Sequence, residues 1–206
     1  MCFSASASFI SGTGLIALGG ASFALAKKDQ RVIAVIPLIF GVQQIIEGFQ
    51  WLYLNNDSSS LIAGYSFLFF AFIFWPIYTP TFIYILDKKN RSKTKWFIFL
   101  GIAVAIYLFG ILLVNKLTIQ KLESCINYGF KFPLQNLTGL CYMLSVFGPF
   151  FTSSKKVFRW FGVVFAFFAI LAWIYYQINF VFVWCFFAAI VSLLFFLYIR
   201  SEKLIK

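Results

Sequence analysis

The stretch Phe40–Trp51, FGVQQIIEGFQW, places one carboxylate and three amides inside an apolar run long enough to cross a membrane. An ionised carboxylate in hydrocarbon costs about 3 kcal/mol or more, so Glu47 must face protein or water, or be protonated. On a helix, Gln44, Glu47 and Trp51 share one face, because they are spaced i, i+3 and i+7. This face predicts the wall of an internal polar site. The amides that flank it are Gln43 and Gln50.

The composition is that of a membrane protein. The 206 residues are 62% hydrophobic and 11% charged, with a mean hydropathy of +0.91, which lies outside the range of soluble domains. The net charge of +11 sits in short basic clusters between apolar runs, which is typical of membrane-protein loops, so we expect no nucleic-acid partner. Histidine is absent, which removes the commonest metal ligand, and we expect neither a metal nor a cofactor.

Seven apolar runs, each close to the length of about 20 residues that a membrane span needs, predict an all-α membrane protein. We expect a single seven-helix transmembrane domain over residues 1–206. In the first span, Ala5, Gly12 and Gly19 are spaced by seven, which predicts a side that a neighbouring helix approaches closely. The expected spans are 7–26, 32–54, 60–86, 96–114, 134–152, 157–176 and 179–199.

The distribution of basic residues predicts the orientation. With the N-terminus outside, the inner loops and tail hold fourteen of the 17 lysines and arginines, and the outer side holds Lys116, Lys121 and Lys131. The positive-inside rule therefore predicts an N-terminus outside and a C-terminus in the cytoplasm. The longest outer connection is 115–133, where apolar residues alternate up to Phe132, which predicts a short strand or hairpin.

Polar residues gather toward the outer half of the predicted bundle. Glu47 precedes the outer end of its span by seven residues, which places it about 10 Å below the outer edge. We expect an outward-opening pocket with the connection 115–133 as its rim or lid. The alternative is that these amides and hydroxyls only join helices and that Trp51 anchors its helix at the interface. The candidate ligand-binding residues are Gln43, Gln44, Glu47, Trp51, Ser4, Ser8 and Cys141.

Of the four cysteines, Cys2 and Cys125 both fall on the outer, oxidising side. A disulfide between them would clamp the N-terminus to the long connection. Cys141 is an alternative partner, and free thiols remain open. Cys185 lies within a span, where we expect it to be a small buried side chain.

The opening MCFSASASF and the stretch FGVQQIIEGFQW resemble a family of small multi-pass bacterial membrane proteins of unknown function. Members begin with a similar MCFSA-x-ASF and carry a Q-x-x-EG-x-x-W element in the second span. The matching positions cover about the first quarter of the chain. The resemblance implies a bacterial inner-membrane location and no known activity. The matching residues are Met1 to Ala5, Ala7 to Phe9, Gln44, Glu47, Gly48 and Trp51.

These observations favour a binding protein, transporter or sensor for a small amphipathic or cationic molecule or a lipid headgroup. Glu47 would be the counter-charge or proton-coupled group, the amides of Gln43 and Gln44 would orient the ligand, and Trp51 would stack on it. The alternative is an accessory subunit of a larger membrane complex, or a homo-oligomer. A lipid-cleaving enzyme that uses Cys2 or Ser4 is the least favoured interpretation, because histidine, a paired carboxylate and a metal set are missing, and we name no catalytic residue.

Overall fold

The computed structural model describes residues 4–122, 125–129, 133–175, 187, 189 and 191–204. This part of the chain is mostly helical, in agreement with the expected all-α class, and it forms two compact units. The first unit comprises residues 1–67, 119–127 and 168–206, and the second comprises 68–118 and 128–167. Four helical segments are long and apolar enough to cross a membrane, and they correspond to the first four expected spans. They are Ala5–Leu25, Lys28–Asn55, Leu61–Leu86 and Lys88–Val114.

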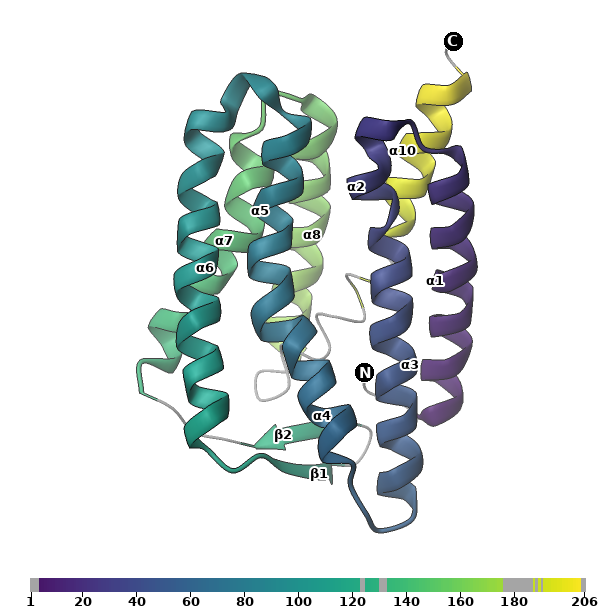
Figure 1. Cartoon of the computed structure of the whole chain (residues 1–206), viewed down its shortest axis with the longest axis vertical. Coiled ribbons are helices and arrows are strands. Elements are labelled where there is room, and N and C mark those ends of the chain that lie inside the picture. Colours follow the sequence, from purple (N-terminus) through teal and green to yellow (C-terminus); the bar gives the residue numbers. More distant parts are fainter. Residues whose placement is uncertain are drawn as a thin grey trace. The chain divides into compact units, whose positions relative to one another are not determined.

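In the first unit, α1 (Ala5–Leu25) packs along α3 (Ile36–Asn55), as Figure 1 shows. The two are joined by η1 (Lys28–Gln30) and the short helix α2 (Arg31–Ala34). Ser4 caps α1, because its Oγ accepts a hydrogen bond from the backbone N–H of Ala7 at 3.2 Å. Pro37 lies in the first turn of α3. Proline is tolerated there, because an N–H at this position has no partner within the helix.

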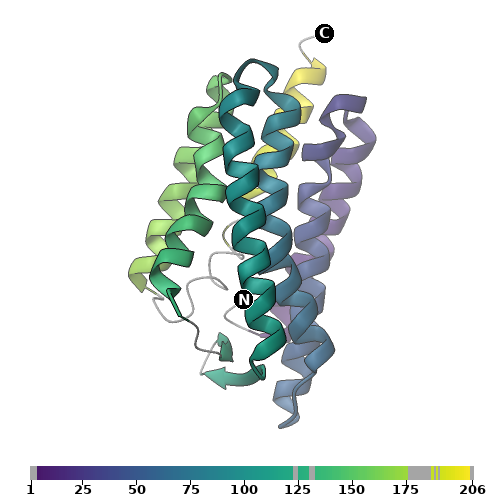
Figure 2. The same ribbon diagram turned by 60° about the vertical axis from the view of Figure 1, so that its left-hand side comes forward.

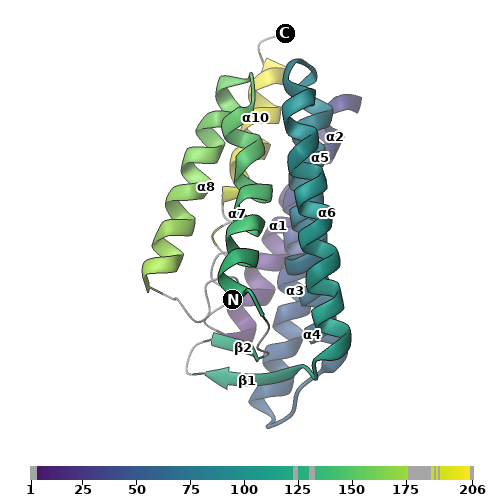
Figure 3. The ribbon, with the colours of Figure 1, turned by 90° about the vertical axis from the view of Figure 1, so that its left-hand side faces the viewer.

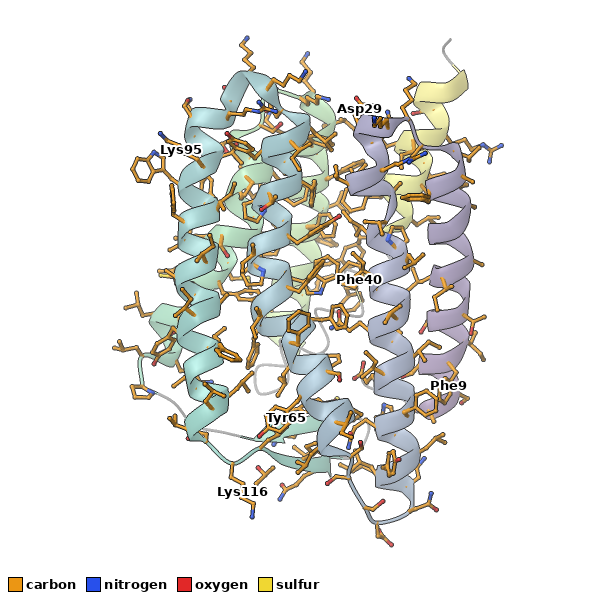
Figure 4. The ribbon with its side chains drawn as sticks, viewed as in Figure 1. Phe9, Asp29, Phe40, Tyr65, Lys95 and Lys116 are labelled. Atoms are coloured by element: carbon orange, nitrogen blue, oxygen red, sulfur yellow. The ribbon has the colours of Figure 1, made fainter. Side chains whose placement is uncertain are left out.

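Glycines set how closely α1 and α3 approach. A Cβ atom on Gly12 would lie 2.9 Å from Cδ1 of Ile45, and one on Gly41 would lie 2.8 Å from the carbonyl oxygen of Gly12. At the end of the pair where α1 begins, Phe9 fills the space beside Gly48, and its ring would lie 2.9 Å from a Cβ there. Figure 4 labels Phe9 at this position. The prediction of a small-residue side on the first helix is therefore confirmed.

The helical segment from Leu61 to Leu86 changes its hydrogen-bond register on the way. It starts as α4 (Leu61–Leu68), continues as the π-helix η2 (Phe69–Phe74) and resumes as α5 (Trp75–Leu86). Pro76 follows the π-helix at the start of α5, where a residue without an N–H is tolerated. The first of the three segments of the first unit ends at Phe67, just before this change of register.

The second unit contains η2, α5, α6 (Arg91–Val114), α7 (Gln135–Thr152) and the start of α8 (Lys156–Tyr175). The aromatic rings of Phe82 and Phe150 meet edge to face, with centroids 5.8 Å apart, and Phe165 packs on Phe150 at 5.4 Å. In Figures 2 and 3 the loop before α6 and the loop before α8 lie at the same end of this unit. Figure 4 labels Lys95 near that end of α6 and Lys116 beyond the other end.

The long connection after α6 folds as the predicted hairpin. Strands β1 (Thr118–Leu122) and β2 (Cys125–Gly129) pair in a two-stranded sheet, visible below α4 in Figure 1. Thr118 Oγ1 donates to the carbonyl of Gly129 at 2.7 Å and closes the open end of the pair.

Two expected boundaries differ from those observed. Helix α6 begins at Arg91 rather than at residue 96, because the polar residues of the basic loop also form helical turns, which stay exposed at Lys93 and Lys95. The first part of the expected span 179–199, together with residues 188 and 190, lies outside the described residues. Helix α10 (Leu193–Leu204) covers its last part, continues beyond it and packs beside α1.

Candidate functional site

Helix α3 buries its polar face completely. The side chains of Gln43, Gln44, Glu47 and Gln50 are 0% exposed, and Trp51 is 1% exposed. The exposed side of the helix is apolar and includes Phe49, which is 50% exposed. A helix that hides its polar residues and exposes its apolar ones is the arrangement expected in a membrane, where the surroundings are hydrocarbon.

Hydrogen bonding along this face is incomplete among the described residues. At one end, the amide of Gln50, oriented to match its surroundings, donates to the carbonyl of Ser60 at 2.7 Å and accepts from its N–H at 3.3 Å. By contrast, the two polar atoms of the Gln44 amide have no hydrogen-bond partner within the described ranges. The same is true of the Nε1 of Trp51. A buried amide without partners costs roughly 1–3 kcal/mol, so Gln44 is a group whose bonding capacity is available to another molecule.

Glu47 lies in the middle of the face, one turn from both Gln44 and Trp51. A carboxylate that is fully shielded from water is stable only if it is protonated, hydrogen-bonded or close to a positive charge. The face therefore combines one acidic group with an amide that has both donor and acceptor atoms, which is the chemistry that recognises a cation with a polar substituent.

A lysine from the hairpin lies where this face approaches the C-terminal end of α3. Lys121 on β1 donates from Nζ to Oδ1 of Asn55 at 2.9 Å, and its Nζ lies 5.7 Å from the centroid of the Trp51 ring. Asn55 is the last residue of α3, one turn beyond Trp51. An ammonium within about 6 Å of a tryptophan face is attracted by the negative potential of the ring.

The remaining predicted residues have different surroundings. Ser4 is the cap of α1, and its Oγ lies 3.0 Å from that of Ser6. Ser8 is 0% exposed and lies on the same side of α1 as Gly12. Cys141 is a half-buried free cysteine of α7, in the second unit, whereas the α3 residues belong to the first unit.

The disulfide prediction can be followed only at one of its two cysteines. Cys125 on β2 is disulfide-bonded, and the free state of Cys141 excludes the alternative pairing between these two residues. The predicted partner, Cys2, lies outside the described residues, as does Cys185. Within the described ranges, no three Cys, Asp or Glu side chains lie together in a way that could hold a metal ion.

The second unit holds a different buried polar cluster, at the loops that precede α6 and α8. Asp87 is 2% exposed, and its carboxylate accepts hydrogen bonds from Ser153 Oγ at 2.8 Å and from both the N–H and the Oγ of Ser154 at 2.6 Å. The two loops are joined again where Asn90 Nδ2 donates to the carbonyl of Thr152 at 2.7 Å.

Electrostatics of the Asp87 cluster favour the ionised form. Burial by itself raises the pKa of the Asp87 carboxyl, but the hydrogen bonds from Ser154, Ser153 and the backbone of Asn90 outweigh this effect and lower the pKa below its ordinary value of 3.8. Arg159 Nη1 donates to the carbonyl of Ser153 at 2.7 Å and supports the same loop.

Sequence reasoning missed Lys121, Asn55 and Asp87. The charge distribution assigns Lys121 to the predicted outer side, and the alternating residues place it on the predicted hairpin, but neither pattern gives it a partner. The sequence has no local pattern that pairs it with Asn55, because the two residues are 66 positions apart. Asp87 opens a basic stretch of the sequence, and the serine pair that follows α7 is the signal that favours a carboxylate partner.

Comparison with protein families assigns the chain to a family. The model of a family described as "Family of unknown function (DUF6629)" matches residues 1–206, so the chain belongs to this family. Neither the curated proteins nor the solved structures include a significant match to the chain. The match covers the full length of the chain, and it assigns no activity to the α3 face.

Proposed function

Starting from membership in this family, we propose that the protein is an integral membrane protein that transports or senses a ligand. The ligand is a small cationic or amphipathic molecule, or a lipid headgroup, and it binds on the buried polar face of α3. The observation that carries the proposal is the combination of Gln44 and Glu47. Both are 0% exposed, and the Gln44 amide has no hydrogen-bond partner among the described residues. An amide that only joins helices would make its hydrogen bonds within the protein, which the Gln44 amide does not do among the described residues.

The proposal includes seven spans in the bacterial inner membrane, with the N-terminus outside and the C-terminus in the cytoplasm. Beyond the four long apolar helices, α8 supports it, because an apolar stripe runs along its exposed side from Trp160 to Ile174 at helical spacing. A stripe of this length suits lipid tails. Its exposed members are Trp160, Val163, Phe167, Ile170 and Ile174.

Each residue of the face has a proposed role. Glu47 supplies the counter-charge or accepts a proton that moves with the ligand, and Gln44 orients the ligand through its amide. Gln43 lines the same face, and Trp51 offers its ring to the cationic part. Ser8, buried on α1, is a further candidate contact, whereas the cap role of Ser4 accounts for its hydroxyl.

The test is native mass spectrometry of the protein in mild detergent, with wild type, Glu47→Gln and a control, Asp57→Asn, compared side by side. Asp57 is exposed in the turn after α3, so its replacement removes one negative charge without touching the face. We expect a small adduct on wild type and Asp57→Asn that is absent from Glu47→Gln, with all three proteins folded. An adduct of equal abundance on all three would show that Glu47 does not hold a ligand.

The second candidate is an accessory subunit of a larger membrane complex. Helix α6 supports it, because a long apolar stripe on its outer side is exposed and could meet a partner helix instead of lipid; it includes Phe99, Ile106 and Leu113. In the same experiment, a second protein chain at a fixed ratio on wild type and on Glu47→Gln would favour this candidate over the ligand site.

A further inference from the structure

The C-terminal end of the α3 face already holds an ammonium group, and it belongs to the protein itself. The Nζ atom of Lys121 has two partners on α3, which are the Oδ1 of Asn55 at 2.9 Å and the ring of Trp51 at 5.7 Å. These partners are one helical turn apart, so a single cation can contact both. An oxygen acceptor beside an aromatic face is a general arrangement for recognising ammonium groups.

The two sides of this contact differ in their freedom to move. Trp51 is 1% exposed and is held in α3, whereas Lys121 is exposed on a two-stranded hairpin. The buried strand β2 keeps the hairpin in place, but an exposed lysine side chain gains little from a single position. The lysine can therefore leave while the ring and Asn55 stay in place.

Glu47 lies one turn deeper along the same face, about 6 Å from Trp51 along the helix axis. A ligand that places an ammonium over Trp51 would thus have its positive charge within reach of the electrostatic field of Glu47. Lys121 and such a ligand would compete for the same ring, and their like charges would repel each other. A ligand with an N–H or O–H donor would also compete for the Oδ1 of Asn55.

We infer that Lys121 is an intramolecular occupant of an ammonium position formed by Trp51 and Asn55, and that the ligand of the α3 face is an alkylammonium compound of the choline or ethanolamine type, which displaces Lys121 when it binds. This inference rests on the proposed function, because it specifies the ligand class and the regulation of the same site. The shared chemistry is the alkylammonium group, whether it comes from a free amine or from a lipid headgroup.

The test is calorimetric titration of choline chloride into the protein in phosphatidylglycerol nanodiscs, with wild type, Lys121→Met and Lys116→Met compared. Methionine keeps the length of the side chain and removes its charge, and Lys116, exposed just before β1, is the matched control. The substitution frees the Trp51 ring and removes the positive charge that repels the ligand. We therefore expect Lys121→Met to bind choline about tenfold more tightly than wild type. Lys116→Met should bind choline as wild type does.

Two outcomes would overturn the inference. One rejects the role of Lys121, and the other rejects the ligand class. Equal affinity in all three proteins would show that Lys121 does not occupy the site, although an alkylammonium ligand would remain supported. No choline binding by any of them would reject the ligand class, while the Glu47→Gln mass spectra decide the proposed function separately. Repeating the titration with phosphatidylcholine in the nanodiscs separates the sources, because a bound lipid headgroup would weaken the binding of free choline.

Discussion

The polar cluster around Asp87 and the polar face of α3 are both buried, but they differ in how their polar atoms are satisfied. Asp87 accepts three hydrogen bonds from Ser153 and Ser154 that tie two loops together. On α3, the Gln44 amide and the Nε1 of Trp51 have no such partners among the described residues. The difference indicates that the Asp87 cluster serves stability, whereas the Gln44 amide and the Nε1 of Trp51 add no such stabilisation, which is what the proposed binding role requires.

The largest expected effect is on the satisfied cluster. Asp87→Ala leaves Ser153 and the Ser154 N–H without their acceptor, so the free energy of unfolding should fall by about 3 kcal/mol. Unfolding in mixed detergent micelles measures this loss, with Asp57→Asn as the exposed control that should change stability by less than about 0.5 kcal/mol. If Asp87→Ala is as stable as the control, the cluster has no structural role and the comparison fails.

Acid should remove the same contribution without a mutation. The pKa of Asp87 is lowered in the folded protein, so its stabilisation is complete above the unfolded value of 3.8 and is lost as the pH falls through the folded value. As the pH is lowered from about 5 to below 3.8, the free energy of unfolding should therefore fall less for Asp87→Asn than for wild type. Parallel pH profiles for the two proteins would contradict the assignment.

A pair of substitutions on α3 tests the other half of the comparison, with a smaller effect. Gln44→Met removes an amide without described partners and should raise the free energy of unfolding by about 1 kcal/mol. Gln50→Met, on the same face, removes the two bonds to Ser60 and should lower it by about 1 kcal/mol. If both substitutions destabilise the protein equally, Gln44 has a structural partner and is not available to a ligand.

The smallest effect is expected for Lys121→Met, which should change the free energy of unfolding by less than about 0.5 kcal/mol, because its contacts are at the surface. The same unfolding experiment measures it. A loss above about 2 kcal/mol would show that Lys121 is a structural link between the hairpin and α3, and it would place this residue with the Asp87 cluster instead.

Much of the fold was predictable because it depends on local patterns. Apolar runs marked the helices, the heptad of Ala5, Gly12 and Gly19 marked the contact with α3, and alternation marked the hairpin. The spacing of Gln44, Glu47 and Trp51 also identified one buried face. The number of spans beyond four and the orientation in the membrane stay predictions, because membrane sidedness is a property of the lipid surroundings and not of the chain alone.

The site could be predicted only where its residues share an element. The α3 residues were found together, but the contacts of Lys121 with Asn55 and of Asp87 with Ser154 join residues that are 66 and 67 positions apart. No local pattern encodes such pairs, since they depend on how whole helices and hairpins pack. Cys141 is a further example. The sequence places it in the same half of the predicted bundle as Glu47, but the two residues belong to different compact units.

The glycine contacts between α1 and α3 also bear on how the protein is made. Both helices lie within the first 55 residues, so the pair can pack while the ribosome is still adding the remaining chain. A larger side chain at Gly12 or Gly41 would then act during synthesis, by leaving α3 and its buried carboxylate without a neighbouring helix in the bilayer. We therefore expect a lower yield of the protein. The yield is measured as the amount of newly synthesised chain that escapes degradation when no ligand is present.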